Sequence, residues 1–288
     1  MRNEKRHSLP RRLLDQNPER ERRRQIRILV VLERRFGRLF ANEIARESRR
    51  LIEFYRQTGE VPPPSEEHRN RMMQIESDLA ETATRAFGGR ILDQGKSLGL
   101  ILETKFDFAA FFRRTALEWV SKEAIRKRIT DISETTRAKI VSEVARGYAA
   151  GNGVDAIANE INKSVPRISK WRGALIGRTE THGAANNGAV AAASASGLKT
   201  DREWLSVNDS RTRRISENDQ FDHAAMNQVR ISEGEMFKVP KKSGGFELIE
   251  FPGGPSGSAG NVINCRCGTG FIVISSLLDE LDAMPDIE

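Results

Sequence analysis

The sequence predicts an α+β fold that is mostly α-helical, with a helical N-terminal region followed by a small C-terminal α+β module of short strands or a β-ribbon. Two observations support this fold class. Up to about residue 197, apolar residues recur at three-, four- and seven-residue spacings, the period of helices that pack on a core. Over residues 202–274, short apolar stretches instead alternate with Gly, Pro, Ser and Asn, which is typical of strands joined by turns.

This change of character divides the chain into four predicted segments. The first is polar and basic with two prolines, which is typical of a flexible terminal arm, and the last is acidic. In the module between them, helices are expected up to residue 197 and short strands over 202–274. The predicted segments are a flexible basic arm (1–18), a variable helical region (19–129), the module (130–275) and an acidic tail (276–288).

Helix-breaking residues bound the first two predicted helices. The helical period runs over 19–57, and Gly59 with a run of three prolines ends it. Ser65, followed by two glutamates, is a typical start for a second helix, because a hydroxyl caps the free N–H groups and acid favours the first turn. We expect this second helix to be interrupted at Gly88-Gly89, with a short helical continuation after them.

The later helices have equally local boundaries. Asp131 and Glu134 have the spacing of a capping box, which predicts a helix start at Asp131. A short helix is expected near 154–161, and a separate, Ala-rich helix over 166–196. The densest aromatic patch of the chain precedes them, and we assign it to core packing between helices: Phe106, Phe108, Phe111, Phe112 and Trp119.

Composition excludes several classes of protein. The chain has 288 residues, enough for two domains or one large one, with 38% hydrophobic and 30% charged residues. No apolar run approaches the ~20 residues that span a bilayer, and the N-terminus lacks the apolar core of a secretory signal, so we expect an intracellular origin and no membrane partner. The only two cysteines, Cys265 and Cys267, exclude a disulfide framework.

The positive charge is concentrated at the N-terminus. Residues 1–50 hold 16 Lys and Arg against 7 Asp and Glu, whereas the whole chain carries a net +7. Such a segment is attracted to DNA phosphates or to an acidic protein face, but it is also consistent with a solvated, arginine-rich helix. The candidate DNA-binding residues are Arg11, Arg12, Arg22, Arg23, Arg24 and Arg27.

One helix carries polar residues on its apolar face. At ~100° per residue, Arg178, His182 and Asn186 lie on the same side as the apolar residues of this helix, and Glu180 points to the other side. A solvated face would oppose the apolar stripe, and buried polar groups need partners. We therefore expect these three residues to form hydrogen bonds with another segment of the protein.

Further motifs follow this helix, and their order resembles the phage head morphogenesis family, the Mu F-like minor capsid proteins. The pattern is an R-T-E-T helix with a downstream Asn, a Trp strand, a D-x-R-T-R turn, a His, a Phe before a Pro/Gly loop, and N-C-R-C; the resemblance covers residues 130–274. It is carried by Arg178, Thr179, Glu180, Thr181, Asn186, Trp204, Asp209, Arg211, Thr212, Arg213, His223, Phe237, Asn264, Cys265, Arg266 and Cys267.

The chain departs from the family pattern at two points. His223 lies further from the Arg-Thr-Arg turn than the family histidine usually does, and an early Cys-x-x-Cys pair of some relatives is absent.

The resemblance implies a minor head protein of a tailed phage or prophage, structural and not enzymatic, acting in head morphogenesis and in DNA packaging or ejection. Its implied partners are the portal protein, the major capsid or scaffold proteins and phage DNA, in the head or neck of the virion and in the host cytoplasm during assembly. The implied structural motif comprises Arg178, Glu180, His182, Asn186, Asp209, Arg211, Arg213, His223, Asn264 and Arg266.

Two alternatives concern chemistry. Cys265, Cys267, His223 and Asp209 form a candidate zinc site, although zinc cysteines usually have two to four residues between them; otherwise the cysteines are reduced, buried thiols and Arg266 binds a carboxylate or carbonyl. For the turn at Asp209, we favour capping and arginine forks onto Glu180 or Asp222 over catalysis. The alternative functions are a metal-dependent nuclease or hydrolase and a non-catalytic DNA-binding module.

Overall fold

The computed structural model describes residues 11–12, 17–97 and 107–275, and it confirms a mostly helical α+β fold. The helices are α1 (Pro18–Thr58), α2 (Glu66–Ser97), α3 (Phe108–Ser121), α4 (Glu123–Ala149), α5 (Val154–Ala195) and the short α6 (Ala259–Val262), with a 3-10 turn, η1 (Ile215–Glu217). The strands are β1 (Arg11–Arg12), β2 (Lys199–Leu205), β3 (Arg230–Ile231), β4 (Phe237–Pro240), β5 (Phe246–Ile249) and β6 (Gly268–Ser275).

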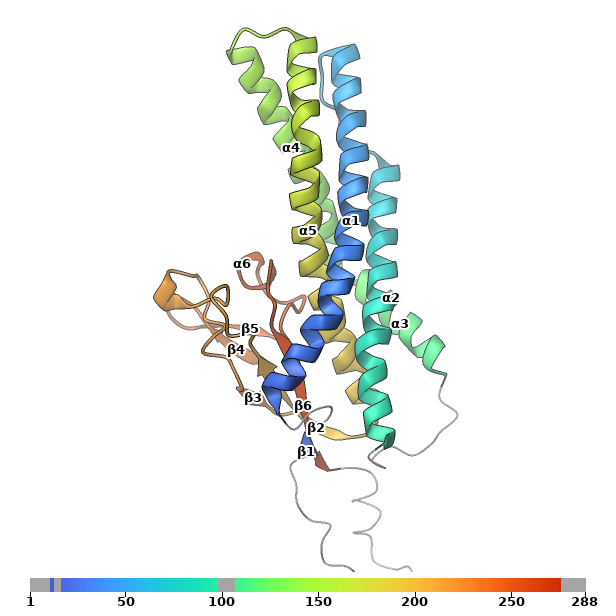
Figure 1. Cartoon of the computed structure of the whole chain (residues 1–288), viewed down its shortest axis with the longest axis vertical. Helices are drawn as coiled ribbons and strands as arrows, with labels where there is room; N and C mark the ends of the chain where they lie inside the picture. The colour runs from blue at the N-terminus through green and yellow to red at the C-terminus, as the bar shows by residue number, and fades with distance from the viewer. Residues whose placement is uncertain (1–10, 13–16, 98–106, 276–288) are drawn as a thin grey trace, which may run out of the picture.

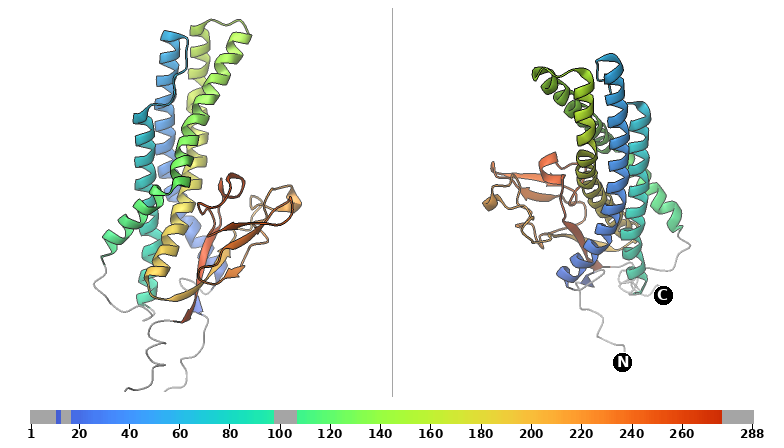
Figure 2. Two further views of the ribbon diagram at one scale, coloured as in Figure 1. Left: turned by 180° about the vertical axis from the view of Figure 1, so that it is seen from behind. Right: turned by 45° about the horizontal axis from the view of Figure 1, so that its top comes forward.

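Long helices form an elongated bundle, and the strands pack beside one end of it (Figures 1 and 2). Helices α1 and α5 have 41 and 42 residues, so each is about 60 Å long at ~1.5 Å per residue. They make the most extensive helix contact of the protein, and α2 packs on α5 from another side. Within the described residues, no helix combines the length and apolar character needed to cross a membrane.

Two small antiparallel sheets form the strand-containing part. The larger has the order β1-β6-β2-β3, and the smaller is the β4–β5 hairpin. Strand β6 is central, because it pairs with β2 through seven residue pairs and with Arg11–Arg12 on its other side. The predicted flexible arm, 1–18, therefore contains a two-residue strand, while residues 1–10 and 13–16 lie outside the described residues, as does the predicted acidic tail.

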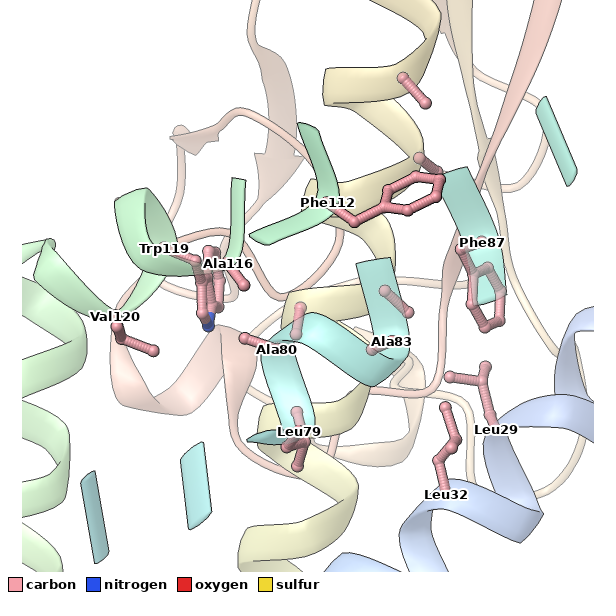
Figure 3. Packing of buried hydrophobic residues seen from close by; sticks show 14 of the residues in the cluster. Leu29, Leu32, Leu79, Ala80, Ala83, Phe87, Phe112, Ala116, Trp119 and Val120 are labelled. Atoms are coloured by element: carbon pink, nitrogen blue, oxygen red, sulfur yellow. The ribbon is translucent and has the colours of Figure 1, made fainter. Parts of the chain in front are cut away.

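One apolar core joins the helices to the central strand. It includes Leu29 of α1, Phe87 of α2 and Trp119 of α3, which Figure 3 labels, and also Phe271 of β6. The predicted boundary between residues 129 and 130 falls inside α4, and the core lies on both sides of it. Of the predicted aromatic patch, Phe111, Phe112 and Trp119 are buried and Phe108 packs against the core; Phe106 lies outside the described residues.

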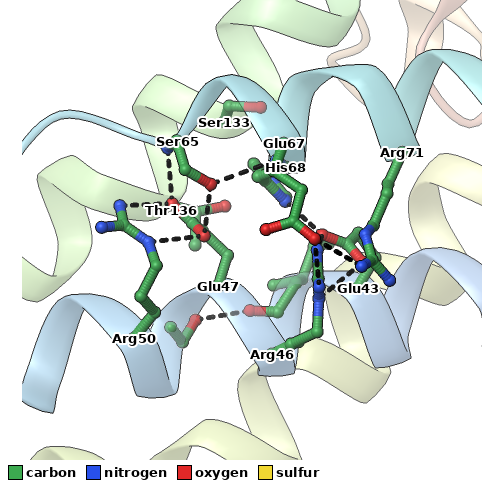
Figure 4. A network of polar contacts seen from close by, with 12 residues as sticks. Glu43, Arg46, Glu47, Arg50, Ser65, Glu67, His68, Arg71, Ser133 and Thr136 are labelled. Atoms are coloured by element: carbon green, nitrogen blue, oxygen red, sulfur yellow. Dashed lines mark hydrogen bonds and ion pairs between the residues drawn. The ribbon is translucent and has the colours of Figure 1, made fainter.

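The predicted start of α2 at Ser65 is confirmed. Its hydroxyl accepts from the backbone N–H of His68 at 3.1 Å, and its own N–H and hydroxyl donate to Glu47 of α1 at 2.8 and 3.0 Å. Glu43, one turn earlier on α1, bonds the His68 ring at 2.9 Å (Figure 4). These buried carboxylates fix the sharp return of the chain between α1 and α2.

Three predicted helix boundaries are wrong. Asp131 lies inside α4, where it pairs with Lys127 one turn away, so the capping box does not form. Helix α5 continues through Pro166, because apolar residues on both sides of it pack on the bundle and outweigh one missing backbone donor. Helix α2 continues through Gly88-Gly89 to Ser97.

Close packing explains the first glycine of the Gly88-Gly89 pair. A Cβ on Gly88 would lie 2.9 Å from the carbonyl oxygen of Gly188 on α5, so this position keeps the two helices close together. A Cβ on Gly89 would meet only the Phe112 ring, at an ordinary 3.7 Å. These glycines therefore serve helix packing and helix continuity, although locally they resemble a helix end.

The two neighbouring glycines should respond oppositely to alanine. Gly89→Ala should stabilise the protein by up to ~1 kcal/mol, because alanine favours the helix. Gly88→Ala should destabilise it, because overpacking costs about 1–3 kcal/mol. The helix preference of alanine offsets part of this cost, as it does at Gly89. Urea unfolding followed by circular dichroism measures both, and equal stabilisation by the two variants would show that α2 and α5 are not in close contact here.

Candidate functional site

The polar face predicted for α5 points into the protein. The Arg178 guanidinium donates to Glu33 of α1 at 3.0 Å, and the His182 ring bonds the other oxygen of Glu33 at 2.8 Å. Burial opposes the charge on Glu33, but the hydrogen bonds from His182 and Arg178 hold the pKa of its carboxyl below the usual value. Burial lowers the pKa of His182, whose side chain is almost completely enclosed. This face of α5 therefore rests on one carboxylate of α1.

The side chain of Asn186 connects α5 to the C-terminal segment. Its Nδ2 donates to the carbonyls of Pro252 and Cys267 at 2.8 and 3.2 Å, and its Oδ1 accepts from the Thr269 N–H at 3.0 Å. All three bonds are buried, and they reach 66 to 83 residues along the chain. One amide thus satisfies three backbone groups, one in the loop at Pro252 and two at the start of β6.

A second contact joins the same two segments. The backbone N–H of Asn264 donates to the Thr179 hydroxyl at 3.0 Å, and its side-chain oxygen accepts from Arg178 at 2.6 Å. We call residues 264–269 the Cys-Arg-Cys ribbon. Together with Asn186, these bonds attach the ribbon along two turns of α5.

Glu180 points away from this face, as predicted, but it is also buried. Its carboxylate accepts from Arg128 of α4 at 3.0 and 3.2 Å. Nearby, burial and then the charge of Glu180 raise the pKa of Glu76 to about 8, and Trp119 donates its ring N–H to Glu76 at 3.1 Å. Helix α5 therefore has buried charge on two sides.

The turn at Asp209 is held by Arg266 of the ribbon. Two guanidinium nitrogens donate to the two Asp209 oxygens at 2.8 and 2.5 Å, and this pairing holds the pKa of Asp209 far below its usual value. Asp209 also accepts from the Arg211 N–H at 3.0 Å, which is the predicted turn capping. The predicted forks onto Glu180 or Asp222 are wrong, because Arg213 instead donates to the carbonyls of Asn261 and Ile263.

A cleft of about 250 Å³ lies between α1, α5 and the ribbon. Its lining includes Glu33, Arg178, His182, Arg211 and Arg266.

His223 faces the two cysteines of the ribbon. Its Nδ1 lies 3.6 Å from the Sγ of Cys265 and 3.6 Å from the Sγ of Cys267, and all three side chains are buried. Its other ring nitrogen, Nε2, bonds the side-chain oxygen of Asn261 at 2.7 Å. Asp209, the fourth ligand predicted from sequence, is bound to Arg266 and does not belong to this cluster.

A buried arginine lies close to the thiols. Burial lowers the pKa of Arg22 to about 10, while charge on Cys267 and Cys265 acts in the opposite direction. Burial opposes ionisation of Cys267, yet the hydrogen bonds with Cys265 and His223 and the charge of Arg22 together lower the pKa of its thiol. Arg22 is only 4% exposed, which corrects its assignment to a DNA-binding surface.

Three of the other arginines predicted to bind DNA differ from Arg22. Arg23, Arg24 and Arg27 are exposed on α1, and Arg11 and Arg12 form strand β1.

Sequence reasoning missed two important partners. Glu33 falls on the apolar stripe of α1 between Leu29 and Phe36, so the rule that revealed the polar face of α5 also applies to it. Asn261 carries no comparable signal, because it lies in the four-residue helix α6, which is too short for periodicity to distinguish a buried amide from an exposed one.

The buried Glu76 should make stability depend on pH. Its folded pKa of about 8 exceeds the usual value of 4.5, so its stabilising contribution is present below about pH 4.5 and is lost as pH rises through 8. At ~1.4 kcal/mol per unit, the loss amounts to a few kcal/mol. Glu76→Gln should flatten the fall in unfolding free energy between about pH 5 and about pH 8.5, whereas Glu66→Gln, exposed on the same helix, should keep it. If the unfolding free energy falls equally with pH in the wild type, Glu76→Gln and Glu66→Gln, the raised pKa of the buried Glu76 carboxyl is contradicted.

One of the comparisons with known proteins gives a match. Residues 138–269 match the family model described as Phage Mu protein F like protein. No curated protein and no solved structure matches the chain. The matched segment contains the polar face of α5, the Asp209 turn, His223 and the ribbon, so the predicted family is confirmed over this segment. Residues 138–269, a little under half of this chain, are therefore similar to the phage Mu protein F-like family.

Proposed function

We propose that this protein is a minor head protein that binds the portal of a tailed phage or prophage during procapsid assembly and stays in the neck of the virion. The family match carries the proposal, because the matched residues are those that fasten the Cys-Arg-Cys ribbon to the bundle. These contacts build a rigid module from structural groups. Asp209, a residue of the alternative nuclease, is paired with Arg266, which favours the structural role.

The helical bundle supplies a surface suited to a protein partner. Trp171 of α5 is 59% exposed, and Lys139 of α4 lies 5.2 Å from the centre of its ring. Lys139 also lines a groove of about 240 Å³ between α4 and α5, whose wall includes Ile140, Ile161 and Ile168. Exposed aromatic residues beside apolar grooves are typical centres of protein interfaces. We assign this groove to the portal.

Replacing Trp171 should weaken portal binding. We expect the wild-type protein, co-expressed with the portal protein of the same phage, to co-elute with portal oligomers at low salt. Trp171→Ala should lower the affinity by about 30-fold or more, the ~2 kcal/mol typical of an interface hot spot. Phe246→Ala is the matched control, because Phe246 is 50% exposed and Lys238 lies 5.4 Å from its ring centre, but it belongs to the β4–β5 hairpin. Wild-type protein that elutes apart from the portal would contradict the proposal.

A specific observation also favours a contact with DNA. Exposed arginines follow the outer face of α1 at three-, four- and seven-residue spacings, so a stripe of positive charge faces solvent along several turns. Arginine contacts to phosphates give affinity for DNA without reading its sequence. We therefore propose a second, non-catalytic role in binding phage DNA. The stripe comprises Arg20, Arg23, Arg24, Arg27, Arg34, Arg35 and Arg38.

Substitutions test this role better than truncation, because α1 supplies a large part of the core. Changing Arg20, Arg24, Arg27 and Arg34 to Gln should reduce the slope of log affinity against log salt by ~0.9 for each DNA phosphate that the variant no longer neutralises. Fluorescence anisotropy with a duplex of random sequence measures the slope.

The control replaces four exposed arginines of α2, α3 and α4, namely Arg71, Arg85, Arg114 and Arg146. An equal fall in slope for this control would show diffuse attraction to the whole protein and would exclude a binding stripe on α1.

A further inference from the structure

We propose that His223, Cys265 and Cys267 bind one zinc ion through Nδ1 and two thiolates, with a water molecule as the fourth ligand. The inference is independent of the proposed portal and DNA roles, since it rests on the ligand atoms alone. Those three donor atoms all lie within 4.8 Å of one another, in a buried position.

The distances match a tetrahedral ion. With zinc–sulfur and zinc–nitrogen bonds of ~2.3 and ~2.0 Å, tetrahedral angles place a ligand sulfur about 3.5 Å from a ligand nitrogen. Both sulfur–nitrogen distances in the protein are 3.6 Å. A ligand set of two sulfurs and one imidazole also favours zinc over the harder divalent cations.

Hydrogen bonding alone explains this symmetry less well. Nδ1 of a neutral imidazole has one lone pair and accepts one well-aligned hydrogen bond. In the protein two sulfurs approach that nitrogen at equal distance. An ion at the centre satisfies all three atoms, whereas two thiols would compete for one acceptor.

Surrounding groups orient the ligands. The side-chain oxygen of Asn261 lies 2.7 Å from Nε2 of His223 and can accept a hydrogen bond from it, which leaves Nδ1 unprotonated and free to bind metal. Asn261 is itself held, because its amide donates to Glu247 at 2.9 Å. The backbone N–H of Cys267 points to the Sγ of Cys265 at 3.4 Å, a donor suited to a metal-bound thiolate.

The single residue between the cysteines fits an extended segment. Residues two apart in extended chain project to the same side, and the intervening residue projects to the other. Cys265 and Cys267 accordingly both face His223, while Arg266 binds Asp209. The short spacing that weakens the zinc prediction at the sequence level is therefore compatible with the site.

A cleft lies close to the cluster, on the side of Cys267. Ser206, whose hydroxyl lies 3.9 Å from the Sγ of Cys267, borders a cleft of about 350 Å³ between α1 and β2. Arg22 lines the same cleft. Only the Ser206 side chain therefore separates this cleft from the Sγ of Cys267.

Metal content and spectroscopy test the site in the full-length protein. We expect about one zinc per chain by mass spectrometry after purification without chelator, and a lower melting temperature after zinc removal that recovers on adding zinc alone. Substitution with cobalt should give thiolate-to-metal charge-transfer absorption, which reports sulfur ligation directly. Thiol titration under denaturing conditions should find two reduced cysteines.

Variants localise the metal. Cys265→Ser, Cys267→Ser and His223→Gln should each lose stoichiometric zinc, whereas His68→Gln, at a buried histidine bound to Glu43, should retain it. Asn261→Ala should keep sulfur ligation but weaken zinc affinity by about 10- to 100-fold, the effect of losing an outer-shell partner.

Measurements on the wild-type protein test the zinc site even if a variant fails to fold. Reduced protein that takes up no zinc and gives no cobalt–thiolate absorption overturns the proposal. A disulfide between Cys265 and Cys267 in freshly purified protein overturns it equally.

Discussion

The arrangement of this protein depends on one constraint, namely that the polar residues on the inward face of α5 must find partners after leaving water. An unsatisfied buried donor or acceptor costs about 1–3 kcal/mol, and Asn186 alone engages three backbone groups. Those groups lie 66 to 83 residues beyond Asn186, in the loop at Pro252 and at the start of β6. The ribbon can therefore occupy one place along the helix, and the register of β6 against β2 follows from that place.

The same constraint unites the helical region with the family module. Glu33, in the first helix, accepts from Arg178 and bonds His182, so the motif helix is completed by a residue far outside the matched segment. Glu180 likewise accepts a hydrogen bond from Arg128 of α4, which also lies outside the matched segment. The N-terminal helices thus contribute partners to the module, and the shared apolar core makes bundle and strands one structural unit.

Local patterns in the sequence predict the fold where neighbours along the chain decide the outcome. Periodicity and the Ser65 cap place α1 and the start of α2, and the angular positions of Arg178, His182 and Asn186 reveal a buried polar face. The failures arise where distant segments decide. Gly88 and Pro166 resemble helix ends, yet packing between helices carries the chain through both. Arg22 resembles an exposed arginine in the sequence, but the start of β6 packs against it and buries it. The sequence of one helix cannot indicate burial by a segment that lies more than 240 residues further along the chain.

Cys267 links the two halves of the site through different atoms. Its carbonyl accepts from Asn186, its N–H approaches the Sγ of Cys265, and its own sulfur faces His223. A metal that fixes this residue would also fix the carbonyl on which α5 rests, so the energy of ligation would stabilise the docking of the ribbon on the bundle. Small strand modules bury little apolar surface of their own. For this one, the polar face of α5 on one side and the thiol–histidine cluster on the other supply the rigidity that its short strands cannot.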